Sequence, residues 1–407
     1  MRLRSSLIVG LIIVLSLGAV AYPIFARPKI QEHEHAIQYY QSILLNEQAY
    51  LTKTQLANGA LAMRPRSDGE AYVNPYFANF TAHALMLGEQ VQSEVVRDYL
   101  AWFFLNINKS DPKHRAGSID DFTYTIVSGE IMDASKLEYD SVDSYLASFI
   151  IALHTYLIES QDTGLLIEYE HEWLMILEAF DSTRNPENDL AMVSLANRTQ
   201  YLMDNTEVYG ALILIQDIFD LYWLVPERNK SLENQFQLLE NKMSYWNDTL
   251  DNQINTHLFD EKQFIYAYGL DADGKLLTSK VGDRFYPDGV GQLYPILFGV
   301  DTPKSENAEY RYALFNQNYK WTNFDQFKQG VTDFYWFVVV YAAALMKDET
   351  QLLQFLLNYE EEIMPVHPYP IYNAEVAWVI MACDEMISHH INAIQTLDPF
   401  KLLRSKP

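Results

Sequence analysis

The sequence predicts an all-α protein whose helices, about twelve in number, form an (α/α)6 toroid. Apolar residues recur at helical spacing from about residue 33 to residue 392, whereas alternation of period two is confined to short stretches such as 122–127 and 264–268. Every second predicted helix is apolar on all sides, and its partner is amphipathic. A ring of buried inner helices surrounded by outer helices satisfies both patterns.

The individual elements follow from these two patterns. The apolar helices, expected to be the inner ones, are residues 76–87, 144–157, 208–219, 290–298, 335–346 and 373–386. Their amphipathic partners are residues 91–107, 165–180, 232–250, 306–319 and 349–362. The inner helices start at irregular intervals, which favours a closed ring over an open solenoid of fixed short repeats. No linker-like segment interrupts the pattern, so we expect a single barrel domain over residues 27–407.

The N-terminus has the composition of an export signal. Arg2 and Arg4 precede an uncharged stretch over residues 7–26, which is long enough to cross the hydrocarbon of a bilayer as a helix. Residues 19–21 also have the small-x-small form of a signal-peptidase site. Residues 1–26 are therefore predicted to be a signal peptide or a transmembrane anchor, and the rest of the chain is expected outside the cytoplasmic membrane.

Composition restricts the partners. The 407 residues include 29 Lys and Arg against 54 Asp and Glu, a net charge of −25 that repels phosphate backbones and anionic lipids. We therefore expect no nucleic-acid partner, and membrane contact only through an uncleaved N-terminal segment. The single cysteine, Cys383, excludes an intramolecular disulfide and a thiolate zinc site. We expect a monomer without metal or cofactor.

Acidic and aromatic residues occur together at the start of all six predicted inner helices. Asp and Asn at such positions commonly cap helix N-termini. Capping does not explain the aromatic residues, nor the pairs Asp140 with Asp143 and Asp204 with Glu207, whose spacing of three places two carboxylates near one helix face. Because the inner N-termini of a toroid meet at one mouth, these side chains are expected to line a single cleft.

Carboxylates beside aromatic rings suit the hydrolysis of glycosides. That reaction needs one acid to protonate the leaving oxygen and a second carboxylate to activate water or attack the anomeric carbon. The predicted catalytic residues are Glu70, Asp68, Asp143, Asp140, Glu207 and Asp204. The predicted substrate-binding residues are Tyr72, Tyr76, Tyr145, Tyr209, Arg284, Asp288, Trp336 and Tyr372.

These segments resemble those of the six-hairpin glycosidase superfamily. Residues 139–153 (YDSVDSYLASFIIAL) are similar to the third-hairpin region of glycoside hydrolase family eight endoglucanases and chitosanases, and Asp143 aligns with the Asp of that region. Residues 67–70 (SDGE) resemble the Ser-Glu-Gly general-acid motif of that family, and residues 369–378 (YPIYNAEVAW) resemble a final inner helix. The resemblance implies that Glu70 or Asp68 donates the proton while Asp143, beside Asp140, orients water or holds the sugar. Asp204 and Glu207 are the alternative pair.

Two other functions remain open. A polysaccharide lyase or unsaturated-uronyl hydrolase on the same barrel would need a Tyr base, such as Tyr145 or Tyr209, and a cation such as Arg284 for the uronate. A non-catalytic carbohydrate-binding protein would use its acids only as helix caps. Arginines near the predicted mouth could bind substrate or neutralise structural acids. They are Arg64, Arg66, Arg198 and Arg284.

Overall fold

The computed structural model describes residues 26–328 and 334–397. These form two compact units, one of residues 26–46 and 383–397 and the other of residues 47–328 and 334–382. The predicted signal peptide or anchor lies outside the described residues, except for its last position. Among the helices described, none combines the length and apolarity needed to cross a membrane. The single domain expected over residues 27–407 stays a prediction.

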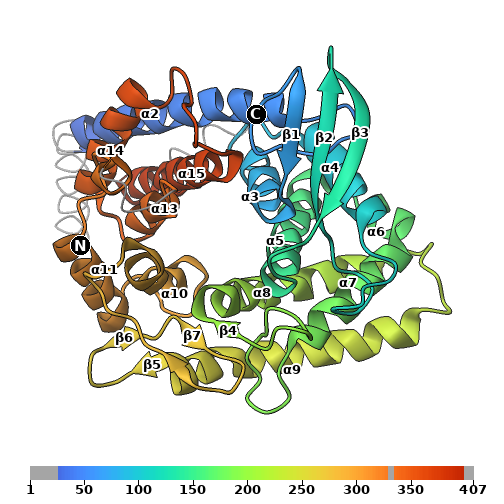
Figure 1. The fold of residues 1–407 in the computed structure, drawn as a ribbon. Helices are drawn as coiled ribbons and strands as arrows, with labels where there is room; N and C mark the ends of the chain where they lie inside the picture. The colour runs from blue at the N-terminus through green and yellow to red at the C-terminus, as the bar shows by residue number, and fades with distance from the viewer. Residues whose placement is uncertain (1–25, 329–333, 398–407) are drawn as a thin grey trace, which may run out of the picture. The chain divides into compact units, whose positions relative to one another are not determined.

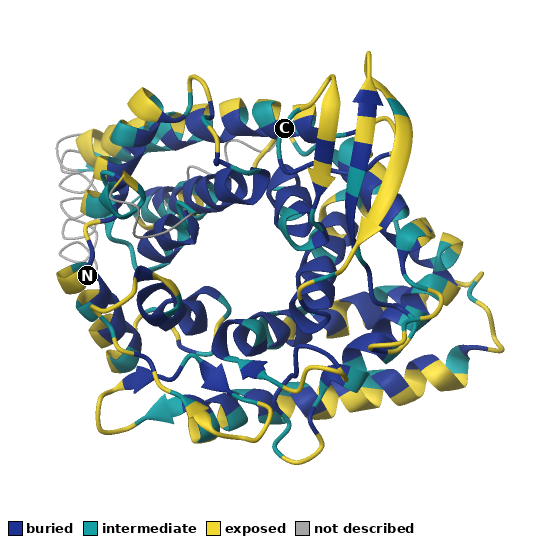
Figure 2. Cartoon of the chain, viewed as in Figure 1, coloured by how far each residue is buried: buried dark blue, intermediate teal, exposed yellow. Residues whose placement is uncertain are grey.

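The larger unit confirms the predicted α/α toroid. Figure 1 shows its inner helices around the centre, and Figure 2 shows them as predominantly buried. They are α3 (Pro75–Leu85), α5 (Asp143–Ser160), α8 (Leu202–Leu224), α10 (Tyr294–Leu297), α13 (Val338–Leu345) and the first part of α15 (Asn373–Leu397). α10 is shorter than the predicted helix 290–298 because the first turn of that range is the 3₁₀ helix η4 (Val290–Gln292). The π-helix η3 (Phe285–Gly289) precedes η4.

The outer helices are amphipathic, as predicted. In α9 (Glu233–Leu258), the buried side chains recur every three or four residues, so one face is packed and the other is in water. The other outer helices are α4 (Ser93–Asn106), α6 (Gly164–Glu168), α7 (Glu170–Thr183), α11 (Glu306–Asn318) and α14 (Glu349–Glu362). Short helices η2 (Thr52–Thr54) and α12 (Asp325–Lys328) lie in connections.

Side chains close the ring of inner helices. The indole of Trp378 on α15 lies 4.5 Å from the ring of Phe80 on α3 and 6.0 Å from the ring of Tyr341 on α13, measured between ring centroids. On α8, a Cβ added at Gly210 would lie 2.9 Å from the ring of Phe298, which follows α10. Glycine therefore permits the close approach of α8 to the residue that ends α10.

Local signals set the start of α3. Asn74 is its N-cap, accepting a hydrogen bond from the backbone N–H of Phe77 at 3.1 Å, and Pro75 occupies the first helical position. Asn74 lies directly after a strand, so the same residue ends one element and begins the next. This cap fixes the position of the first turn of α3, where Tyr76 lies.

Three antiparallel strands form one sheet in the order β1 (Gly69–Val73), β2 (Asp121–Val127) and β3 (Glu130–Leu137). In the chain, β1 precedes α3, and β2 and β3 precede α5. Glu70 pairs with Thr125 and Tyr72 pairs with Thr123, so Glu70 and Tyr72 share one face of this sheet. The remaining strands are two residues long: β4 (Gln200–Tyr201), β5 (Phe259–Asp260), β6 (Ile265–Tyr266), β7 (Gly269–Leu270) and β8 (Leu276–Leu277).

The smaller unit consists of parts of α2 (Arg27–Leu51) and α15. In it, the imidazole Nδ1 atoms of His33 and His390 lie 2.9 Å apart. The ring of Tyr40 stacks on that of His390 with centroids 5.7 Å apart. These contacts hold the two helical segments of this unit together.

Candidate active site

Four of the predicted catalytic acids interact with one another at the N-terminal ends of α5 and α8. Asp140 precedes α5 and is exposed, whereas Asp143 is the first residue of α5 and is fully buried. Asp204 lies in the first turn of α8 and is half-buried, and Glu207 is 1% exposed. The cluster therefore grades from an exposed carboxyl, through a half-buried one, to two buried ones. We call these four residues the acid cluster.

Asp204 has the most informative protonation behaviour in the acid cluster. Burial, followed by the negative charge of Asp140, raises the pKa of Asp204 to about 7, although a hydrogen bond with Ser144 opposes the rise. The Asp204 carboxyl is thus partly protonated near neutral pH, in a residue that is only half-buried. These are the properties required of a general acid.

The two deeper acids favour the protonated state. Burial raises the pKa of Glu207 well above its usual range, and the charge of Asp204 adds to the rise. Burial also raises the pKa of Asp143, with contributions from the charges of Asp204 and Glu207. The start of a helix would stabilise a carboxylate by only about 0.3–1 kcal/mol. Burying an unpaired ion costs several kcal/mol, so burial prevails at Asp143.

One oxygen of Asp143 is available for a further hydrogen bond. Its Oδ1 accepts a hydrogen bond from the Ser144 backbone N–H at 2.9 Å, but the buried Oδ2 has no hydrogen-bond partner in the described part of the chain. Most buried polar atoms in proteins have a partner. In the protonated carboxyl the proton lies on this oxygen, because Oδ1 already accepts a hydrogen bond, so Oδ2 is a donor for a further hydrogen bond.

Tyrosines from neighbouring helices contact the acid cluster. The hydroxyl of Tyr76 on α3 donates a hydrogen bond of 2.5 Å to Oε1 of Glu207. Tyr294, at the start of α10, also interacts with Tyr76 and Glu207. The ring of Tyr145 lies 6.2 Å from that of Tyr76 and is stacked on it. The N-terminal ends of α3, α5, α8 and α10 thus meet, as predicted from the closed ring.

A row of aromatic residues that contact one another extends from the acid cluster along the starts of α10, α13 and α15. Tyr286, which precedes α10, is 38% exposed, and the charges of Asp204 and Glu207 act on its hydroxyl. Its ring stacks on Trp336 at 3.8 Å between centroids. Phe334 contacts both Trp336 and Tyr372, at 5.5 and 5.7 Å. Acids therefore lie at the entries of α5 and α8, and aromatic rings lie at those of α10, α13 and α15.

The two predicted proton donors, Glu70 and Asp68, are exposed. Glu70 lies in β1 on the same sheet face as Tyr72, and Asp68 accepts a hydrogen bond of 2.7 Å from the Ser128 backbone N–H. No interaction of either carboxyl with the acid cluster is found among the described residues. Tyr72, however, lies close enough to Asp140 for that negative charge to raise the pKa of its hydroxyl. A catalytic role for Glu70 or Asp68 stays a prediction.

Asp121 is a site residue that the sequence did not reveal. It is 4% exposed at the start of β2 and accepts hydrogen bonds from the hydroxyls of Tyr72 and Tyr145, the latter at 2.9 Å, and from Nδ2 of Asn74 at 3.1 Å. Burial raises the pKa of Asp121 although all three partners lower it. Asp121 thereby connects β1, the N-cap of α3 and α5 beside Asp140.

Glu375 is a second residue without a recognised role in the sequence. It is 5% exposed at the start of α15, and its carboxylate accepts hydrogen bonds from the backbone N–H groups of Trp336 at 3.3 Å and Phe337 at 2.6 Å. Burial raises the pKa of Glu375 to about 7. Its contacts hold the segment that carries the Trp336 indole in front of α13.

The predicted substrate-binding residues outside this cluster have other partners. Arg284 forms a two-point ion pair with the buried Asp288, at 2.8 and 2.9 Å. The charge that acts on Tyr209 is that of Asp251 on the outer helix α9, so Tyr209 faces away from the acid cluster. Among the described residues, no direct hydrogen bond or ion pair joins Arg284, Asp288 or Tyr209 to the four acids, and their roles in substrate binding stay predictions.

The other arginines also have local partners or lie in water. Arg198 pairs with Glu187 at 3.4 Å, and Arg64 donates a hydrogen bond of 2.9 Å to the backbone carbonyl of His367. Arg66 is exposed. Within the described ranges, no group of three or more His, Cys, Asp or Glu side chains is arranged to hold a metal ion.

Comparison with solved structures identifies the fold. No protein-family model matches the chain, and no curated protein sequence matches it. A solved glycosidase, a glutamate-to-alanine variant, superposes with a TM-score of 0.50 at 13% identity, covering 88% of this chain and 98% of its own. At this identity the match shows a shared fold, in agreement with the predicted α/α toroid.

Two further structures were found at lower similarity. A GH76 α-mannanase from Bacteroides thetaiotaomicron has a TM-score of 0.46 at 12% identity, over 88% of this chain and 97% of its own. A GH78 rhamnosidase from Bacillus sp. GL1 also has a TM-score of 0.46 at 12% identity, over 84% of this chain. The match spans only 34% of that rhamnosidase.

Proposed function

We propose that this chain is a glycoside hydrolase that cleaves an oligo- or polysaccharide by carboxylate acid–base chemistry. The observation that carries the proposal is the position of Asp204, half-buried between the exposed Asp140 and the buried Glu207, with its pKa raised to about 7. The solved glycosidase with the same fold supports the same reaction class. Tyr286 and Trp336 supply aromatic surface on which sugar rings can stack.

In the proposed reaction, the protonated Asp204 carboxyl gives its proton to the glycosidic oxygen as the bond to the anomeric carbon breaks. The Asp140 carboxylate takes a proton from the water that attacks that carbon, so the products are a free reducing sugar and an alcohol. Asp143 and Glu207 stay protonated beneath Asp204, so they add no negative charge beside it. Tyr76 holds Glu207 in place.

The proposed location is outside the cytoplasmic membrane, either secreted or anchored. Its support is the uncharged N-terminal stretch behind Arg2 and Arg4. The proposed partner is carbohydrate and not nucleic acid, since the net charge is −25. The proposed working form is a monomer.

Substitution of Asp204 tests the activity. The protein is incubated with a panel of soluble polysaccharides, and the reducing ends released are measured. We expect Asp204→Asn to lower kcat by about 10²- to 10⁴-fold, the usual contribution of a general acid. Asp217→Asn is the matched control, because it makes the same change at an exposed position of the same helix. Equal activity of the two variants would refute the assignment.

A further inference from the structure

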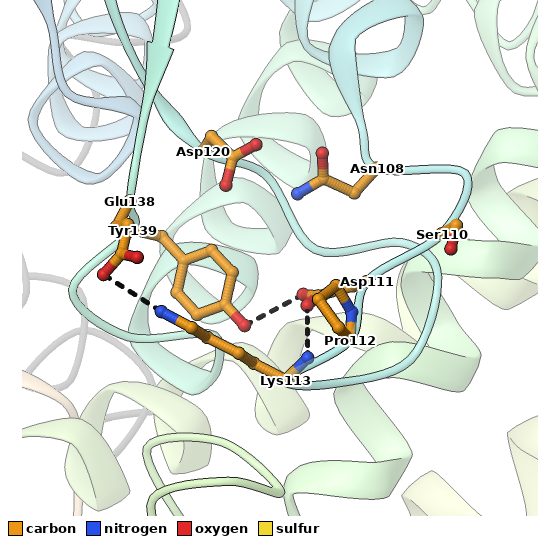
Figure 3. A pocket seen from close by; sticks show the side chains of 8 residues that line it. All are labelled: Asn108, Ser110, Asp111, Pro112, Lys113, Asp120, Glu138 and Tyr139. Atoms are coloured by element: carbon orange, nitrogen blue, oxygen red, sulfur yellow. Dashed lines mark hydrogen bonds and ion pairs between the residues drawn. The ribbon is translucent and has the colours of Figure 1, made fainter.

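A pocket outside the acid cluster lies beside the entry to α5. It has a volume of about 200 Å³ and is formed by the connection between α4 and β2 together with the end of the β2–β3 hairpin. Figure 3 shows the ring of Tyr139 across the middle of its lining, with Asp120 and Asn108 on one side and Lys113 on the other.

The connection that forms the pocket is long but held in one conformation. It comprises residues 107–120, and loops longer than about 12 residues without secondary structure are usually functional when they are ordered. Asp111 accepts hydrogen bonds from the hydroxyls of Ser118 and Tyr139, at 2.5 and 2.9 Å, and from the Lys113 backbone N–H at 2.8 Å. The buried His114 is held by the Ala179 carbonyl at 3.0 Å. The pocket is therefore preformed.

The lining suits a neutral, hydroxyl-rich ligand. Lys113, the one cation of the lining, pairs with Glu138 at 2.9 Å, and the carboxylates of Asp111 and Asp120 leave the lining net negative. The pocket therefore disfavours an anion and offers a hydroxyl group one ammonium donor and several carboxylate acceptors. Vicinal hydroxyls of a sugar each donate and accept, which matches this mixture. The Tyr139 hydroxyl is anchored to Asp111, and its ring has no aromatic partner among the described residues. The volume is below the ~300–1,000 Å³ of pockets for drug-sized ligands, which suits a single sugar ring.

The pocket adjoins the acid cluster through the chain itself. Tyr139 lines the pocket and Asp140, the next residue, belongs to the acid cluster, so their Cα atoms are about 3.8 Å apart. The pocket and the acid cluster are thus joined by a single peptide bond at the entry to α5. We infer that this pocket is a subsite that binds an uncleaved sugar unit of a polysaccharide, with Tyr139 as its stacking platform. This inference rests on the proposed function, to which it adds a place where a second sugar unit of the substrate binds.

Binding without turnover tests the subsite separately from the activity. All proteins carry Asp204→Asn, and their retardation is measured in native gels that contain hydroxyethyl cellulose, xylan, galactomannan or soluble starch. Ser110→Trp fills the pocket from its exposed rim, where the Ser110 side chain makes no hydrogen bond in the described part of the chain. Tyr139→Ala removes the platform, and Tyr139→Phe keeps it. Glu227→Trp adds the same indole to an exposed position of another loop.

We expect at least one polymer to retard the parent protein, and Ser110→Trp and Tyr139→Ala to weaken its binding about tenfold. Tyr139→Phe and Glu227→Trp should bind like the parent. Undiminished binding by Ser110→Trp would overturn the subsite, as would a parent protein that none of the four polymers retards. The hydrolysis assay with and without Asp204→Asn decides the proposed function independently, since retardation requires no cleavage.

Discussion

The hydroxyl of Tyr76 on α3 donates a hydrogen bond of 2.5 Å to Oε1 of Glu207 on α8, and so joins two inner helices that are far apart in sequence. Glu207 is 1% exposed, and burial raises its pKa while this hydrogen bond lowers it. The bond therefore compensates part of the cost of placing a carboxyl among apolar helices.

Removal of this donor should destabilise the fold. We expect Tyr76→Phe to lower the free energy of unfolding by about 1–3 kcal/mol, because a buried carboxyl loses its hydrogen-bond donor. Urea denaturation at pH 7 measures the change. Tyr310→Phe, at a tyrosine that is 46% exposed, is the control and should have no effect. Unaltered stability of Tyr76→Phe would mean that the bond is not formed in solution.

The pH dependence of activity should follow the protonation of Asp204. If its protonated form is required, kcat/KM falls tenfold per pH unit above the pKa of about 7. The negative charge of Asp140 contributes to this raised pKa, so Asp140→Asn should move the alkaline limb of the residual activity to lower pH. The pH–rate profiles of both proteins decide this. A limb that stays in place, or moves to higher pH, would contradict the coupling.

Glu375 should make stability depend on pH. Its pKa is raised from 4.5 to about 7 in the folded chain, so the folded state binds the proton more tightly than the unfolded state. The resulting contribution is complete below pH ~4.5 and is lost as the pH rises to about 7, to the extent of ~3 kcal/mol. Glu375→Gln should remove this decline, which urea titrations between pH 4 and pH 8 measure. A parallel decline in both proteins would exclude Glu375 as its source.

Much of the architecture could be predicted because its causes are local. The alternation of apolar and amphipathic helices follows from periodicity within each segment, and the closed ring brings helix entries together regardless of the loops between them. The pairing of Asp204 with Glu207 was foreseeable, since a spacing of three keeps both on one helix face. The same helical periodicity directs Tyr209 away from the acid cluster, because it lies about 200° around α8 from Glu207 and faces α9.

The residues that were missed depend on distant contacts. Asp121 has no motif around it, and its partners Asn74 and Tyr145 lie 47 and 24 positions away in sequence. Glu375 is buried by the segment at Trp336, 39 positions away. Arg284 and Asp288, predicted to bind substrate, differ from these two because their pairing is local, across four positions, and their role in binding stays a prediction. Only the folded chain shows that Asp288 is buried and takes up the arginine.

The loop that forms the pocket should depend on one glycine. Gly117 has φ +111°, and a Cβ placed there would lie 2.2 Å from the Met175 carbonyl oxygen on α7. Gly129 also has positive φ, at +84°, but a Cβ there would meet nothing within 4 Å. Gly129→Ala should therefore cost only the backbone strain, about 1–2 kcal/mol, whereas Gly117→Ala adds an overpacking cost of about 1–3 kcal/mol. Thermal or urea unfolding of the pair compares the two costs, because both variants place an alanine at positive φ and only Gly117→Ala also meets another segment. Equal destabilisation would show that α7 and the loop are not packed this closely in solution.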